Sequence, residues 1–195
     1  NISSDRRILH VLSQHFNIDD RPSIQDPEGL TGSRLEAKVH LVTSSKITEK
    51  DFETCFDELD IEIDGFVLEP LASSYSILDD DEKKLGSIML DIGGGTTDLA
   101  IYGHGSIWHS EVLPMGGDLI TKDIAIGVKI PLQDAEKLKR EAGNIFPESV
   151  PEEELIEISE VGAGRRRTMT RRQLCQIVQA RSDEILQAVA KTIRT

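Results

Sequence analysis

Three consecutive glycines framed by threonines and aspartates restrict the fold of this sequence more than any other feature. The segment Asp91–Asp98 reads Asp-Ile-Gly-Gly-Gly-Thr-Thr-Asp and lies between two short β-prone runs, Ser87–Leu90 and Leu99–Tyr102. Without Cβ atoms, the backbone N–H groups of a tight hairpin can approach an anion closely. The threonine hydroxyls can donate to phosphate oxygens, and the aspartates can hold a metal bound to those phosphates. The pattern therefore predicts a phosphate and magnesium loop, and with it a nucleotide site.

Composition excludes several classes of function. The chain has 195 residues, of which 38% are hydrophobic and 29% are charged, as in an ordinary globular protein of one large or two modest domains. Its net charge of −13 argues against direct binding of nucleic acid, which needs clustered lysine and arginine. No apolar run is long enough to cross a bilayer. Cys55 and Cys175 match no metal-ligand spacing, and we expect two reduced thiols.

Hydrophobic periodicity predicts alternating strands and helices in the first part of the chain. We expect strands over 8–20, 35–43 and 61–68, and a helix over 49–58. The second strand alternates, which predicts one half-buried face; its residues are Leu35, Ala37, Val39 and Leu41. The helix is expected to be capped by Thr48 and to bury a stripe of Phe52, Cys55, Phe56 and Leu59.

The second part of the chain continues this alternation. A helix of small residues is expected to begin at Glu69-Pro70, followed by a solvated acidic turn over 79–84. Later elements are expected as strands near 97–103 and 106–113, and as helices from Gly116-Gly117-Asp118 to about 126, over 132–142 and from about 171 onward. This order places the chain in the α/β or α+β class.

Four motifs in sequence order resemble the actin superfamily of ATPases. They are the Glu-Pro-x-Ala-Ser helix at 69–73, the glycine hairpin at 91–98, the Gly-Gly-Asp turn at 116–118 and the Glu-x-x-Lys pair at 136–139. The resemblance implies an α/β, actin-like (ribonuclease H-like) ATPase fold. Longer stretches over 29–43, 68–75 and 113–118 together with 121–126 resemble the FtsA family of bacterial cell-division proteins in particular.

The FtsA resemblance implies a partial fold with the inserted subdomain 1C. Residues 1–59 would form the second part of 1C, 60–86 the end of subdomain 1A, 87–127 the start of 2A and 128–195 most of 2B. The chain begins at Asn1 and ends within a helical run, so we expect a fragment of a longer protein. The family's first phosphate loop, its adenosine-binding loop and its membrane-binding amphipathic tail would lie outside this chain, which we expect to bind ATP weakly or not at all by itself.

The resemblance also assigns roles around the glycine hairpin. The β- and γ-phosphates of ATP would contact Gly93, Gly94, Gly95, Thr96 and Thr97. Asp91 would position Mg²⁺ through water. Glu69 would orient the water that attacks the γ-phosphate. A carboxylate that only interacts with the dipole of its own helix is the alternative for Glu69.

On the nucleoside side, three residues of one predicted helix resemble adenosine contacts: Glu136, Lys139 and Arg140. An exposed i,i+3 ion pair would look identical in sequence. Gly116 and Gly117 would let the start of the preceding helix approach the nucleotide, or would form a plain turn.

The implied function is that of a division scaffold. ATP would act mainly as an assembly switch, and hydrolysis would at most be slow. The protein would polymerise and contact other division proteins through 1C, and would anchor filaments of the tubulin homologue FtsZ to the cytoplasmic membrane at the septum. A basic cluster at 165–167, 171–172 and 181 resembles the surface that receives the FtsZ C-terminal tail, with Arg181 as the contact; a solvated face is the alternative. Rival functions on the same fold are a phosphotransferase or chaperone-type ATPase, an MreB-type scaffold and a PilM-like pilus assembly protein.

Overall fold

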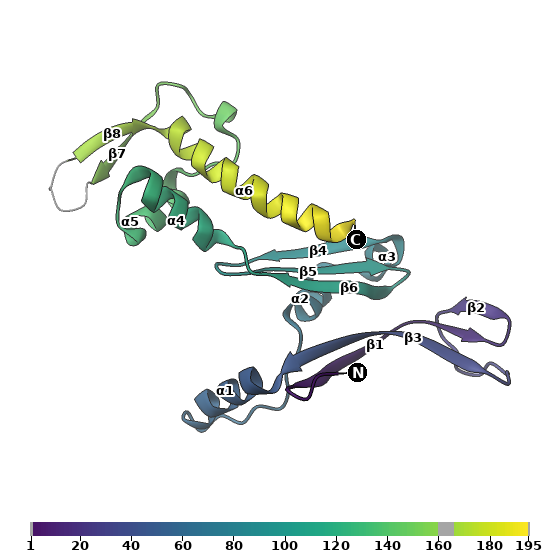
Figure 1. The fold of residues 1–195 in the computed structure, drawn as a ribbon. Coiled ribbons are helices and arrows are strands. Elements are labelled where there is room, and N and C mark those ends of the chain that lie inside the picture. The colour runs from purple at the N-terminus through teal and green to yellow at the C-terminus, as the bar shows by residue number, and fades with distance from the viewer. Residues whose placement is uncertain (1, 160–165, 195) are drawn as a thin grey trace. The chain divides into compact units, whose positions relative to one another are not determined.

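Figure 1 shows the computed structural model, which describes residues 2–159 and 166–194. The chain divides into two compact units. The first unit comprises residues 1–91 and 99–111, and the second comprises residues 92–98 and 112–195. The chain therefore passes between the units through the sheet that contains the glycine hairpin.

The first unit begins with a three-stranded antiparallel sheet in the order β2-β1-β3. Its strands are β1 (Arg6–Ile18), β2 (Arg21–Ile24) and β3 (Leu35–Ser45). The long pairing of β1 with β3 runs from Arg6 opposite Ser45 to Ile18 opposite Leu35, with two register shifts on the way. Helix α1 (Lys46–Asp57) follows β3 directly, and the Ser45 side chain caps its first turn.

Two short helices lead to the second sheet, whose order is β4-β5-β6. The elements are α2 (Glu69–Ile77), α3 (Asp80–Leu85), β4 (Ser87–Ile92), β5 (Thr97–Gly103) and β6 (Ser106–Leu113). The turn between β5 and β6 has positive φ at His104 and Gly105, as a tight hairpin requires. A hydrophobic core cluster of the first unit consists of Leu71, Met89, Ala100, Tyr102 and Ile107.

Helices dominate the second unit. They are α4 (Gly117–Val128), α5 (Leu132–Ala142), the 3-10 turn η1 (Pro147–Ser149) and α6 (Arg171–Ile193); strands β7 (Leu155–Ser159) and β8 (Arg166–Thr170) form an antiparallel pair. The core gathers apolar residues of α4, α5, α6, β7 and the connection between α4 and α5: Ile124, Val128, Ile130, Ala135, Ile158, Leu174 and Val178. The side chains of Thr170 and Gln173 form a capping box at the start of α6.

Several predicted elements are confirmed, with small shifts. Strands β5 and β6 and helix α5 have the expected bounds, α4 extends to Val128, and α6 is one continuous helix from Arg171. The acidic turn predicted over 79–84 is wrong: it is helix α3, because the Asp79 side chain and Glu82 form a capping box there.

Three predictions for the first unit are also wrong. Residues 61–68 form no strand, since no described strand pairs with them. Ser45, not Thr48, caps α1, and its hydroxyl accepts from the Thr48 N–H. The stripes predicted to be buried on β3 and α1 stay largely exposed, with Leu35 at 60% and Phe52 at 52% exposure. Periodicity identifies a face fit for burial, but does not ensure that the chain itself covers it.

The two cysteines differ in environment. Cys55 on α1 is exposed, whereas Cys175 on α6 is buried, with its Sγ 3.7 Å from the carbonyl oxygen of Ala142. Both thiols are free in this structure. Among the described residues, no helix combines the length and apolar character that a membrane span requires.

Candidate functional site

The glycine hairpin is an exposed turn between β4 and β5. The Gly93 N–H donates to the carbonyl oxygen of Thr96 over 2.9 Å, which closes the turn. None of the three glycines has a positive φ, so backbone handedness does not require glycine at any of them. A Cβ on Gly94 would lie 3.2 Å from Oδ1 of Asp118, whereas one on Gly95 would meet nothing within 4 Å.

The start of α4 is bonded directly to this hairpin. The Gly117 N–H donates to the carbonyl oxygen of Gly93 over 2.9 Å, and the Asp118 N–H donates to that of Gly94 over 2.8 Å. A Cβ on Gly116 would lie 2.4 Å from the carbonyl oxygen of Gly94, so only glycine fits at this position. The glycine hairpin and the first turn of α4 are therefore held together by backbone hydrogen bonds. Contact of Gly116 and Gly117 with a nucleotide stays a prediction.

The two threonines of the hairpin have different surroundings. Thr96 is exposed, and its hydroxyl donates to Oδ2 of Asp98 over 3.0 Å. Thr97 is fully buried, and its hydroxyl donates to the carbonyl oxygen of Met115 over 2.7 Å. Thr97 thus ties β5 to the segment before α4, and Thr96 is the threonine on the open side of the loop. Their predicted phosphate contacts stay predictions.

Glu136 and Lys139 of α5 form an ion pair beside the start of α4. The Lys139 Nζ lies 2.6 Å from Oε2 of Glu136 and donates to the carbonyl oxygen of Gly117 over 3.1 Å. The Lys139 ammonium and the Thr121 hydroxyl lower the pKa of the Glu136 carboxyl, because both hydrogen-bond to its charged form. The i,i+3 pair that sequence leaves as an alternative thus exists, and it lies next to the glycine hairpin.

Thr121 is a member of this group that sequence reasoning missed. Its hydroxyl lies 2.5 Å from Oε2 of Glu136, and it accepts from the Lys139 Nζ over 2.9 Å. The available signal was a hydroxyl residue on the inner, otherwise apolar stripe of α4, where it lies with Ile124 and Val128.

Two hollows border the exposed side of this group. One of about 470 Å³ is lined by residues from the starts of α4 and α5: Asp118, Thr121, Lys122, Leu132, Gln133 and Glu136. The other, of about 520 Å³, is lined by Gln133, Glu136, Lys137, Arg140 and Glu141, which places Arg140 at its wall. The second unit thus brings the predicted nucleoside contacts to concave surface beside the hairpin.

The first unit holds the other two predicted residues. Glu69 is the exposed first residue of α2, and Asp91 lies near the end of β4, where the Ser73 hydroxyl reaches its Oδ2 over 3.4 Å. Among the described residues, no three His, Cys, Asp or Glu side chains converge to hold a metal ion. The magnesium contact of Asp91 and the catalytic role of Glu69 stay predictions.

Arg181 is engaged within its own unit. Its guanidinium pairs with Asp123 over 2.6 and 3.2 Å and with Glu184 over 2.5 Å, and these carboxylates raise its pKa. In the rest of the basic cluster, Arg171 and Arg172 pair with Glu154 and Glu152. Arg165 lies outside the described residues. A partner that binds Arg181 through a carboxylate would compete with these ion pairs.

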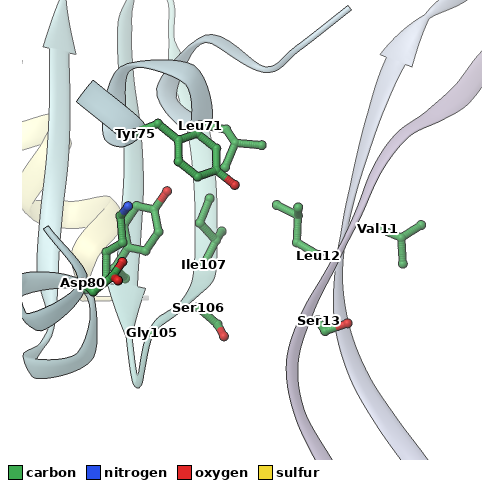
Figure 2. Close-up of a pocket in the computed structure, with 11 residues that line it drawn as sticks. Val11, Leu12, Ser13, Leu71, Tyr75, Asp80, Gly105, Ser106 and Ile107 are labelled. Atoms are coloured by element: carbon green, nitrogen blue, oxygen red, sulfur yellow. The ribbon is translucent and has the colours of Figure 1, made fainter. Parts of the chain in front are cut away.

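The first unit also contains a pocket of about 320 Å³ (Figure 2). Val11, Leu12 and Ser13 of β1 line one side, and the other side comes from α2, α3 and the β5–β6 hairpin. None of the predicted site residues lines this pocket, so it does not belong to the candidate site.

Two family models match the chain. The model "Cell division protein FtsA" covers residues 88–194, and "SHS2 domain inserted in FTSA" covers residues 1–43. Among curated relatives, the cell division protein FtsA of Pseudomonas aeruginosa is 40% identical over 99% of this chain and 46% of its own length. FtsA of Bacillus subtilis is 34% identical over 100% of this chain and 44% of its own length. The chain thus spans about half the length of these relatives.

Solved structures confirm the predicted partial actin-like α/β fold. MreB5 of Spiroplasma citri bound to ADP gives a TM-score of 0.63 at 19% identity, over 78% of this chain and 49% of that one. A PilM–PilN type IV pilus biogenesis complex gives 0.64 at 14% identity, over 94% of this chain and 45% of that one. At these identities the likeness concerns the fold alone.

Proposed function

Since this chain belongs to the FtsA family of bacterial cell division proteins, we propose that it acts in division as part of an actin-like scaffold that binds ATP. In this proposal the protein polymerises and contacts other division proteins through 1C. It anchors FtsZ filaments to the cytoplasmic face of the inner membrane at the septum, and reaches the membrane only through a tail outside this chain. ATP acts as an assembly switch, with slow hydrolysis at most.

The proposal also assigns each part of the chain to a subdomain of the family. Residues 1–59 are assigned to 1C, 60–86 to the end of 1A, 87–127 to the start of 2A and 128–195 to most of 2B. The match of the inserted domain to the first 43 residues supports the assignment to 1C. When bound, magnesium would neutralise phosphate charge; Asp91 would hold its water shell, and Glu69 would orient the attacking water.

One observation carries the nucleotide site: the bonded group of glycine hairpin, α4 start and Lys139. Carbonyl oxygens of the hairpin accept the first N–H groups of α4, and the Gly117 carbonyl accepts from Lys139. A cation is thereby held beside an exposed turn that has no side chains at its three glycines. Such a turn leaves room for a phosphate chain, and the ammonium supplies charge for it. Relatives in fold that were solved with ADP and AMPPNP support the same assignment.

Calorimetric titration of the complete gene product with Mg-ATP tests this site. We expect saturable binding by the natural protein and binding at least about tenfold weaker in Lys139→Met, because a hydrogen-bonded charge is lost. Lys191→Met removes an exposed lysine of α6 and serves as the control, with unchanged affinity expected. A natural protein that binds neither Mg-ATP nor Mg-ADP would refute the nucleotide site.

Capture of the FtsZ C-terminal tail requires a separate test, because Arg181 already pairs with Asp123 and Glu184. We expect a tail peptide to bind the complete gene product and to lose binding in Arg181→Glu, measured by fluorescence anisotropy. Arg194→Glu reverses an exposed charge near the end of the same helix and should leave binding intact. Equal loss in both variants would indicate that net charge, not Arg181, matters.

A further inference from the structure

The Thr121 hydroxyl lies at the centre of the candidate site without belonging to any of its recognised motifs. The residue is only 7% exposed. Its Oγ1 lies within hydrogen-bond distance of three groups: the Glu136 carboxylate at 2.5 Å, the Lys139 ammonium at 2.9 Å and the Gly117 carbonyl at 3.2 Å. Loss of a buried hydroxyl with two charged partners is costly, because each partner would lose a hydrogen bond in surroundings of low dielectric constant.

The hydroxyl has one proton to place among these partners. Lys139 has only donors, so the Thr121 oxygen accepts from it. The proton can go to the Glu136 carboxylate or to the Gly117 carbonyl, and the carboxylate is both nearer and charged. Hydrogen bonds to ionised acceptors are about twice as strong as neutral ones. The hydroxyl therefore donates to Glu136 while it accepts from Lys139.

These bonds connect the two sides of the site. The Asp118 N–H donates to the carbonyl oxygen of Gly94 in the hairpin, and the Gly117 carbonyl of the same peptide group accepts from Lys139 on α5. Thr121 lies one helical turn after Gly117 and contacts both members of the α5 pair. A continuous chain of hydrogen bonds thus runs from the hairpin carbonyl to the Glu136 carboxylate.

We propose that Thr121 is a positioning residue of the nucleotide site, whose hydroxyl fixes the Glu136 carboxylate and the Lys139 ammonium relative to the glycine hairpin. This inference rests on the proposed nucleotide function and adds a residue to it. Thr121 does not itself need to touch the nucleotide. It determines where the two charged groups of α5 lie when the nucleotide arrives.

Three substitutions of Thr121 separate the hydroxyl from the rest of its side chain. Thr121→Val keeps the branched shape and removes the hydroxyl, Thr121→Ala removes it with a smaller side chain, and Thr121→Ser retains it. Thr54→Val is a matched control, because the Thr54 hydroxyl also bonds to the carbonyl four residues earlier in a helix, that of Lys50 over 2.8 Å. Thr54 lies on α1 in the first unit.

Two measurements on the complete gene product test the proposal. The first is the dissociation constant for Mg-ATP by calorimetry. We expect this dissociation constant to rise about tenfold in Thr121→Val and Thr121→Ala, in line with the loss of a charge-assisted hydrogen bond, and to stay unchanged in Thr121→Ser and Thr54→Val.

The second measurement is a ¹³C NMR titration of the Glu136 carboxyl without nucleotide, assigned with Glu136→Gln. We expect a higher pKa in the valine and alanine variants and the natural value in the serine variant.

The two measurements separate the failure of this inference from the failure of the nucleotide site. If the natural protein binds Mg-ATP and the hydroxyl-free variants bind it equally well, the positioning role is overturned while the site stands. An unchanged Glu136 titration in those variants would overturn the hydrogen bond on which the role depends. If the natural protein binds no nucleotide, the proposed function fails, and the positioning role fails with it.

Discussion

At Gly116 the absence of a side chain determines how closely α4 approaches the glycine hairpin. A Cβ there would lie 2.4 Å from the carbonyl oxygen of Gly94 and 2.6 Å from that of Gly93, and neither backbone atom can rotate away. We expect Gly116→Ala to separate hairpin and helix and to lower the free energy of unfolding by about 1–3 kcal/mol, as overpacking does. Urea denaturation followed by circular dichroism measures this change.

Gly95→Ala is the matched control, because a Cβ at that position would meet nothing within 4 Å. Its stability should stay within about 0.5 kcal/mol of the natural protein, as for ordinary surface substitutions. Equal losses in the two variants would contradict the spatial argument, since they would point to backbone conformation in place of contact.

Glu136 predicts a pH dependence whose sign follows from its environment. Lys139 and Thr121 lower the pKa of its carboxyl in the folded state. The stabilisation is therefore present in full above the ordinary glutamate pKa and is lost as pH falls through the lowered folded value. We expect Glu136→Gln to lose less stability than the natural protein over that acidic range, in urea denaturation at a series of pH values. Parallel curves for the two proteins would contradict this expectation.

At the scale of elements, the start of α6 provides a direct test of local stability. Thr170 accepts from the Gln173 N–H, and the Gln173 side chain accepts from the Thr170 N–H. Thr170→Ala is expected to cost about 1 kcal/mol of unfolding free energy, the usual value for a lost N-cap. Thr168→Ala, at an exposed position of β8, is the control and should have little effect in the same denaturation experiment. A Thr170 variant as stable as the control would show that tertiary packing alone fixes where α6 begins.

Elements defined by local chemistry could be predicted, and those that depend on a partner could not. The β5–β6 hairpin and α5 follow from turn glycines and from a proline before the helix, which act within a few residues. Residues 61–68 have β-prone composition, but a strand exists only when another strand pairs with it. The capping box of α3 was readable in sequence as Asp79 and Glu82 and was missed because the run is so acidic.

In the candidate site, too, features set by local sequence could be predicted, and contacts that depend on packing could not. The glycines and the Glu136–Lys139 pair are visible as motifs, because their spacing along the chain is short. Thr121 contacts residues 15 and 18 positions away, so its role depends on how α4 packs against α5. The ion pairs of Arg181 were missed for a similar reason, since Asp123 lies 58 positions away. Sequence therefore identifies the chemical groups, and packing determines which of them meet.

At the scale of the whole molecule, we expect the proposed site to need more than this chain provides. The chain spans 46% of the length of its Pseudomonas relative, and we expect further nucleotide contacts of the family to lie in the remaining portion. The 195-residue chain alone should therefore show weak or no binding of Mg-ATP by calorimetry. Its circular dichroism spectrum should confirm that it is folded in the same buffer. Micromolar affinity would contradict the view that the missing portion contributes to the site.

The unequal exposure of the two thiols makes the natural chain selectively addressable by covalent chemistry. An alkylating dye reaches the exposed Cys55 on α1, whereas Cys175 is enclosed by the core of the second unit. Brief labelling therefore attaches a fluorophore to the first unit with no mutation. Any later, slower labelling of Cys175 reports how often the interior around α6 opens. The rate of this labelling therefore measures local opening of the second unit.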